Sequence, residues 1–279
     1  MDIKPEKRLS RKQIFHIAKR YNIKIDSFNL DGFGRLDVHG DVRVCKSGLK
    51  KLPLKFGKVT GNFYCHLNNL TTLDGAPFSV GGDFNCSDNK LQNLKFSPRD
   101  VAGDYFCQNN ELKSLEGAPT IIHGSFNCFL NQLKTLRNAP KEVYGSFYCF
   151  PNELHTLEGA PSFVGKSFHV GSNPLNDLKG CPSFIGDLLT FDSCISSINI
   201  GSKNSSVNQV KIQIQGSDKD FDSKLHQVII DNEKFLPIIF KYFSNLNLYE
   251  DGDVSLKSLH GFALDNFKDI ILDIKEGLR

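Results

Sequence analysis

The sequence lacks the features that mark a membrane protein, a secreted protein or a common class of enzyme. It has no apolar run of about 18 residues, so no membrane-spanning helix is expected. The segment from Met1 to Arg20 carries charges without an apolar core, which argues against a secretory signal. It contains no P-loop, no G-x-S-x-G and no H-E-x-x-H motif. We therefore expect a cytoplasmic, non-enzymatic protein with no cofactor and no metal.

The sequence also lacks a strong excess of either charge. Its net charge of +3 neither favours nor excludes nucleic acid as a partner. Basic residues are concentrated in residues 1–24, against only Asp2 and Glu6: they are Lys4, Lys7, Arg8, Arg11, Lys12, Lys19, Arg20 and Lys24. Such clusters contact phosphates in nucleic-acid binders, but a charged helix face is more often only solvated. Nucleic-acid binding through this segment therefore stays an alternative.

The sequence does contain a repeat of constant length. Five cysteines follow one another at intervals of 21 residues: Cys65, Cys86, Cys107, Cys128 and Cys149. An aromatic residue lies two positions before each, an asparagine three after, and leucines five and eight after. Six repeats match closely between about residues 61 and 182, with weaker ones on either side. A period of this size is typical of a solenoid, whose repeats stack along one axis.

The repeating positions have distinct physical roles. The pair Phe-x-Cys alternates like a short strand with both side chains inward, and strands stacked at about 4.8 Å would form a parallel sheet. The asparagine column, Asn68 to Asn173, can bond backbone groups exposed at the bend. A small-Pro corner such as Ala76-Pro77 cannot donate to a ladder, so we place it on an irregular convex side.

These columns resemble the leucine-rich repeat, L-x-L-x-x-N-x-L-x-x-L, with an aromatic and a cysteine in the first two apolar positions. The predicted fold is an α/β repeat solenoid: a leucine-rich-repeat parallel β-sheet with an irregular convex side and a helical cap at each end. The predicted boundaries are 1–41 for the N-terminal cap, 42–200 for the solenoid, and 201–279 for a C-terminal strand and helical cap.

Both caps are predicted from local patterns. Ser10 and Gln13 form a capping box ahead of a helix, and the segment 23–44 alternates like short strands. At the other end, residues 210–214 alternate like one more strand. Helical patterns follow at 221–229, 235–243 and 265–274. A small independent binding module is the alternative for this C-terminal unit.

The cysteine column favours neither disulfides nor metal binding. Its thiols are predicted to point into the core, and no histidine or second cysteine follows at ligand spacing. Reduced cysteines that pack as small apolar side chains are the preferred interpretation. Cys45, Cys181 and Cys194 lie off the column, and none has an activating neighbour that is visible in the sequence.

The residues that flank each inward pair are predicted to point out of the sheet and to line a concave face. We interpret the weak last turn as one residue shorter than the others between Ile185 and Leu188. Leu188 and Thr190 are then predicted to point inward, and Phe191 outward. The predicted partner-binding residues are Tyr64, His66, Phe106, Gln108, Phe129, Leu130, Tyr148, Phe150, His169 and Phe191. Aromatic residues rimmed by asparagine and glutamine are typical of protein interfaces. Self-association and carbohydrate binding are alternatives for the same face.

A second resemblance covers most of the chain. The segment Phe56 to Phe63, the motifs L-x-x-L-x-G-A-P and G-G-D-F-N-C-S-x-N-x-L, and the tail Phe267 to Leu278 are similar to leucine-rich-repeat proteins encoded by tailed bacteriophages and their hosts. The resemblance implies a phage protein that acts inside a bacterium by binding a host protein. Inhibition of a host defence system is one form of this hypothesis.

Overall fold

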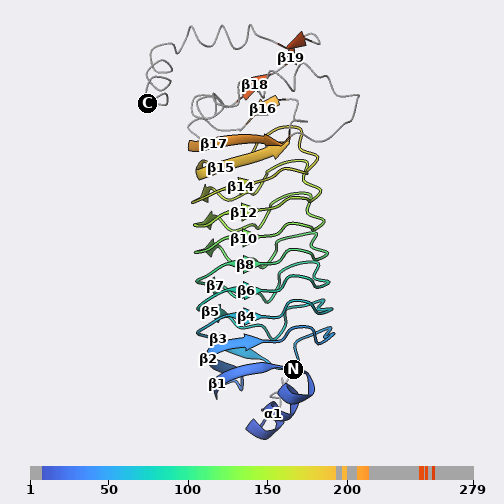
Figure 1. The fold of residues 1–279 in the computed structure, drawn as a ribbon, viewed down its shortest axis with the longest axis vertical. Helices are drawn as coiled ribbons and strands as arrows, with labels where there is room; N and C mark the ends of the chain where they lie inside the picture. The colour runs from blue at the N-terminus through green and yellow to red at the C-terminus, as the bar shows by residue number, and fades with distance from the viewer. Residues whose placement is uncertain are drawn as a thin grey trace, which may run out of the picture.

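A computed structural model of the chain describes residues 8–192, 197–199, 206–213, 245–247, 249–250 and 253–254. The repeats form a parallel β-solenoid of about seven turns (Figure 1). Each complete turn contributes two short strands, and each strand pairs mainly with its counterpart one repeat away. The predicted stacking of the 21-residue units is therefore confirmed.

The first strand of each turn begins at the aromatic position. This first column consists of β4 (Phe63–Tyr64), β6 (Phe84–Asn85), β8 (Tyr105–Phe106), β10 (Phe126–Asn127), β12 (Phe147–Tyr148) and β14 (Phe168–His169). The strands pair in parallel and in register, so that Phe126 lies opposite Phe147 and Asn127 opposite Tyr148. The aromatic residue is buried and the residue after it faces away from the core, as the alternation predicts.

The second strand of each turn lies at the β-branched position. This second column consists of β3 (Phe56–Val59), β5 (Ser79–Val80), β7 (Asp100–Val101), β9 (Ile121–Ile122), β11 (Glu142–Val143) and β13 (Phe163–Val164). Its ladder is interrupted between β7 and β9 within the described strands. The side that was expected to be irregular thus also carries short strands, because a buried valine or isoleucine follows an outward residue here and the backbone extends.

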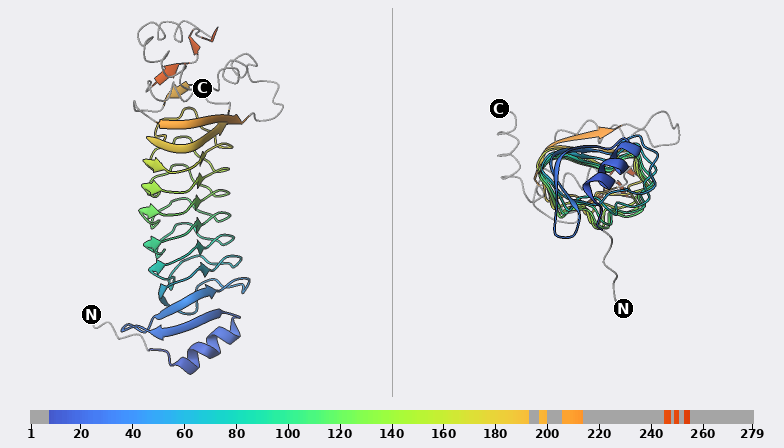
Figure 2. Two further views of the ribbon diagram at one scale, coloured as in Figure 1. Left: turned by 60° about the vertical axis from the view of Figure 1, so that its left-hand side comes forward. Right: turned by 90° about the horizontal axis from the view of Figure 1, so that it is seen from below.

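The turns stack in a straight column rather than a horseshoe (Figure 1; Figure 2, left). Both columns advance by one inter-strand spacing, about 4.8 Å, per turn, so neither side of the coil is longer than the other. The face that the sequence predicted to be concave is therefore flat.

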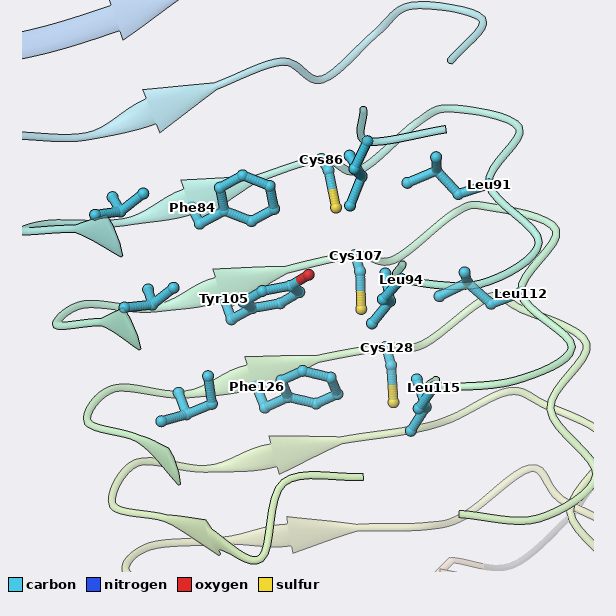
Figure 3. Close-up of a cluster of buried hydrophobic side chains, with 14 of the residues drawn as sticks. Phe84, Cys86, Leu91, Leu94, Tyr105, Cys107, Leu112, Leu115, Phe126 and Cys128 are labelled. Atoms are coloured by element: carbon cyan, nitrogen blue, oxygen red, sulfur yellow. The ribbon is translucent and has the colours of Figure 1, made fainter. Parts of the chain in front are cut away.

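The core is built from stacked columns of identical positions. Figure 3 shows Phe84, Tyr105 and Phe126 above one another, with ring centroids 5.1 and 5.2 Å apart, beside a matching column of thiols. Burial raises the pKa of the Cys86 thiol to about 12, so it stays protonated and unreactive at neutral pH. All five column cysteines are free and buried, as predicted.

Tyr105 is the one tyrosine in the aromatic column, and its hydroxyl has a dedicated partner. The Tyr105 hydroxyl lies 2.7 Å from Ser97 Oγ. Ser97 occupies the corner position that Ala76 and Ala118 hold in other turns. A buried phenol needs such a partner, so the two departures from the repeat compensate each other.

The asparagine column forms a buried ladder. Asn110 donates from Nδ2 to the carbonyl of Cys86 in the preceding turn at 3.1 Å and to that of Cys107 at 3.2 Å. Its Oδ1 accepts from the backbone N–H of Leu91 at 3.0 Å. Asn68, Asn89, Asn131, Asn152 and Asn173 repeat this pattern. The predicted bonding of the amide to the bend is confirmed, and it links adjacent turns.

A second polar ladder, which the sequence analysis missed, lies at the corner before each first-column strand. Asp83 Oδ1 accepts from the backbone N–H of Asp104 at 2.9 Å, and Asp104 Oδ1 accepts from that of Ser125 at 2.6 Å. The preceding glycines allow this close approach. A Cβ on Gly124 would lie 2.6 Å from the carbonyl oxygen of Gly103, so a side chain does not fit there.

The N-terminal end matches its prediction in secondary structure. Helix α1 (Arg11–Arg20) begins with the capping box of Ser10 and Gln13, and Ile14 is buried in the core. The strands β1 (Lys24–Leu30) and β2 (Leu36–Arg43) then pair antiparallel. Strand β2 is long enough to start both columns, pairing with β3 and β4. Helix and hairpin lie at one end of the column (Figure 2).

At the other end, β15 (Phe184–Asp192) joins the two columns and pairs in parallel with β17 (Ser206–Gln213), which confirms the predicted further strand. Short pairs follow: β16 (Ser197–Asn199) with β18 (Asn245–Asn247), and β19 (Tyr249–Glu250) with β20 (Asp253–Val254). The helical patterns predicted at 221–229, 235–243 and 265–274 lie outside the described residues.

The register of the last turn differs from its prediction. In β15, Leu189 pairs with Phe168 and Thr190 with His169, so the 21-residue period continues without a deletion. Leu189 is the inward residue, and Leu188 is not. A shift of one residue in a strand exchanges its two faces, which places Phe191 in the core as well.

Candidate binding surface

The outward residues of the first column form the surface that the sequence analysis proposed. The residue after each inward aromatic, and the residue after each inward cysteine, lie on this side, which we call the first face. On the first face, Tyr64, His66, Phe106, Gln108, Phe129, Tyr148, Phe150 and His169 are all partly exposed, and Leu130 beside them is 48% exposed.

Four of these residues make a continuous cluster over three turns. The rings of Tyr148 and His169 are parallel, with centroids 4.7 Å apart, and Phe129 stacks on Phe150 at 6.2 Å. Phe150 also lies 5.9 Å from His169 and 6.4 Å from Tyr148. We call these four residues the outer aromatic cluster. Because the rings stack on neighbours one turn away, part of each stacked ring face is covered by the adjoining ring.

The histidine of the cluster is held by a hydrogen bond from the next turn. His169 Nδ1 lies 2.9 Å from Thr190 Oγ1, which is itself buried. Burial lowers the pKa of His169, while Asp187 opposes the shift. A neutral imidazole at neutral pH suits an apolar contact surface better than a charged one.

The other predicted residues are not part of this cluster. Tyr64 and His66 lie together at the N-terminal end, where their rings are 6.1 Å apart. One polar turn, with Asn85 and Ser87 on the first face, separates them from the rest. Phe106 and Gln108 occupy the middle turn, and the Gln108 Oε1 atom is buried without a hydrogen-bond partner in the described structure. Tyr64 and His66 therefore form a second group of rings on the first face, apart from the outer aromatic cluster.

Phe191 does not belong to the surface. Its side chain is 0% exposed and it is part of the hydrophobic core. The prediction is wrong because it assumed that the last turn is one residue short. With the observed register, Phe191 takes the inward position that Val170 and Cys149 hold in the preceding turns.

The outward residues of the second column form a second aromatic surface, which the sequence analysis missed. Phe163 stacks on Phe184 with centroids 4.8 Å apart, and Tyr144 lies 5.4 Å from Phe163 and 5.8 Å from His123. We call these four residues the second-face cluster. The available signal in the sequence was the aromatic residues on either side of the β-branched column.

The basic N-terminal segment is described from Arg8 onward, and part of its charge is used within the fold. The Arg11 guanidinium lies 5.3 Å from the centre of the Phe28 ring and donates to the Phe28 carbonyl. Arg20 packs similarly over Tyr21, at 5.4 Å. These contacts occupy two of the cations that the nucleic-acid alternative would need.

No described helix has both the length and the apolar character needed to cross a membrane. No three histidine, cysteine or acidic residues of the described part gather closely enough to hold a metal ion. The chain matches no protein-family model, no curated protein and no solved structure.

Proposed function

We propose that the chain is a non-enzymatic binding protein of the leucine-rich-repeat type that holds a partner protein on its first face. The observation that carries this proposal is the outer aromatic cluster: Phe129, Tyr148, Phe150 and His169 emerge from consecutive strands with ring centroids 4.7 to 6.4 Å apart. Large rings on a rigid scaffold provide contact area at a low cost in side-chain entropy.

The stacking of rings within the outer aromatic cluster favours a protein over a carbohydrate as the partner. Sugars stack on open ring faces, whereas the rings of Tyr148 and His169 cover each other at an interplanar angle of 6°. Partly exposed rings beside an exposed aliphatic side chain, Leu130, suit the mixed apolar surface of a protein. Neutral polar residues around the cluster would form the rim of such an interface.

The partner that we propose is a protein of a bacterial host, and the mechanism is occlusion of its surface. The support is the resemblance of the repeat and corner motifs to phage-encoded leucine-rich-repeat proteins, together with the inward leucine and asparagine columns. Blocking a host defence protein is the form of this function that a small, rigid, non-enzymatic chain can perform by binding alone.

The test is capture of a partner by two matched double variants. Phe129→Ser with Phe150→Ser is expected to weaken partner binding about 100-fold or more, because two central aromatic anchors are removed. Tyr144→Ser with Phe163→Ser, which empties the second-face cluster, is expected to leave affinity within about threefold. Affinity would be measured by calorimetry with the partner isolated from bacterial lysate. The reverse pattern would assign binding to the second face and contradict the proposal.

Self-association through the same face is the second candidate function, because apolar clusters on a monomer often mark contacts between copies. It predicts a mass that rises with protein concentration in light scattering, without any partner. The same Phe129→Ser, Phe150→Ser variant would then stay monomeric. A concentration-independent monomer mass for the unaltered chain would exclude this candidate.

A further inference from the structure

Cys45 differs from the other cysteines in both exposure and neighbours. It is partly exposed, whereas the other six described cysteines are buried. Its residue number is 21 below that of His66, so the two side chains occupy equivalent outward positions in adjacent turns. The Cys45 Sγ atom lies 3.5 Å from His66 Nδ1 and 3.4 Å from the carbonyl oxygen of Tyr64. These distances are within the range of hydrogen bonds made by sulfur.

The surroundings of the pair are aromatic and carry charges of both signs: Arg43 forms an ion pair with Asp41 at 3.4 Å. The Tyr64 ring meets the His66 ring edge-on at 85°, and the Arg43 guanidinium lies 4.6 Å from the centre of the Tyr64 ring. Arg43 and Lys46 both act electrostatically on Cys45 and on His66, and Asp88 acts on His66 from the following turn. A partly exposed thiol therefore lies beside an imidazole, and the charges that act on its sulfur are the cations Arg43 and Lys46, which favours an anionic reagent.

The pKa directions leave the thiol protonated and the imidazole neutral before attack. Burial raises the pKa of the Cys45 thiol, so the sulfur keeps its proton at neutral pH. Burial lowers the pKa of His66, although Asp88 opposes this, so the imidazole is available as a neutral base. In the tautomer with the proton on Nε2, the Nδ1 atom can accept the thiol proton.

We propose that Cys45 and His66 form a thiol-exchange site that accepts disulfides of small anionic thiols. His66 Nδ1 takes the proton from Cys45 Sγ as the sulfur attacks one sulfur of the reagent. The reagent's S–S bond breaks, a mixed disulfide forms on Cys45, and the departing thiolate takes the proton from His66. Cys45 is oxidised and half of the reagent is reduced to a thiol, so atoms and electrons balance.

This site is independent of the proposed partner surface. The outer aromatic cluster lies on the turns of β10, β12 and β14, whereas Cys45 and His66 lie at the turns of β2 and β4. A mixed disulfide on Cys45 would add bulk and negative charge to the N-terminal end of the first face. The reaction of Cys45 can therefore be tested without any partner protein.

The experiment uses the full chain with Cys194→Ser, because Cys194 lies outside the described residues. The protein is incubated with oxidised glutathione, an anionic disulfide, or with cystamine, a cationic one, and modification of each cysteine is followed by peptide mass spectrometry. We expect a mixed disulfide on Cys45 and at least tenfold less on each buried cysteine. We also expect oxidised glutathione to react several-fold faster than cystamine at low salt, with Arg43→Gln reducing this preference.

The role of the histidine is tested by His66→Gln. The variant is expected to slow the reaction of Cys45 at neutral pH at least tenfold, with an unchanged circular dichroism spectrum. Iodoacetamide alkylates thiols without a disulfide. With this reagent we expect the same difference in Cys45 reaction rate between the unaltered chain and His66→Gln at neutral pH. The difference is expected to disappear as the pH approaches 10, where hydroxide removes the thiol proton. A merely structural histidine would not produce this convergence. An unchanged rate in His66→Gln, or faster labelling of the column cysteines than of Cys45, would overturn the proposal.

Discussion

Replacement of Asn110 by leucine is expected to lower the free energy of unfolding by about 3 to 5 kcal/mol. The amide bonds the carbonyls of Cys86 and Cys107 and the backbone N–H of Leu91, all in the interior of the coil. Leucine has a similar volume but no polar atoms, so these groups lose a partner where water does not replace it. Each buried group left unsatisfied costs about 1 to 3 kcal/mol.

The measurement is urea denaturation followed by circular dichroism, with two further variants. Asn110→Asp keeps an acceptor for Leu91 but directs a carboxylate at carbonyl oxygens, so it is expected to be destabilised to a similar degree. Gln132→Leu, at an exposed position, is expected to change stability by less than about 0.5 kcal/mol. Equal stability of Asn110→Leu and Gln132→Leu would contradict the structural role of the asparagine ladder.

Replacement of Phe126 by alanine is expected to cost about 3 to 5 kcal/mol. The ring is fully buried and stacks between Tyr105 at 5.2 Å and Phe147 at 5.3 Å. Its removal leaves a cavity in the middle of the stack, and a rigid coil whose turns contact only their neighbours cannot collapse around it. The loss therefore combines the transfer free energy of the ring with the cost of the cavity.

Phe96→Ala provides the matched control, because the Phe96 side chain is 66% exposed. The same chemical change is expected to alter stability by less than about 0.5 kcal/mol there. Thermal and urea unfolding of both variants would measure the difference. A Phe126→Ala protein as stable as Phe96→Ala would show that the aromatic column is not the core of the coil.

The 21-residue period predicted most of the fold, because inward positions in a solenoid repeat without exception over the central turns. The pairing of Phe126 with Phe147 and the burial of Cys128 follow from spacing alone. The second strand of each turn was harder to predict. A two-residue strand such as β11 carries a single inward residue, Val143. A pattern this short cannot be distinguished from a turn.

Errors in the candidate site had a specific cause. Phe191 was misplaced because the weak last repeat has no cysteine or asparagine at the matching column positions to fix the register, and a one-residue shift exchanges core and surface. The contact of Cys45 with His66 was missed because neighbours were sought a few residues away in the sequence. In a solenoid the relevant neighbour lies one full repeat away, and their common spacing from Val44 and Cys65 was the available signal.

Hydroxyl-radical footprinting, with and without the captured partner, tests the central claim most directly, because it reports the exposure of individual rings. In the free chain we expect oxidation of Phe129 and Phe150 and protection of Phe126. In the complex we expect oxidation of Phe129 and Phe150 to fall, while Tyr144 on the second face stays as reactive as before. Undiminished oxidation of Phe129 and Phe150 in the complex would contradict the assignment of this face to partner binding.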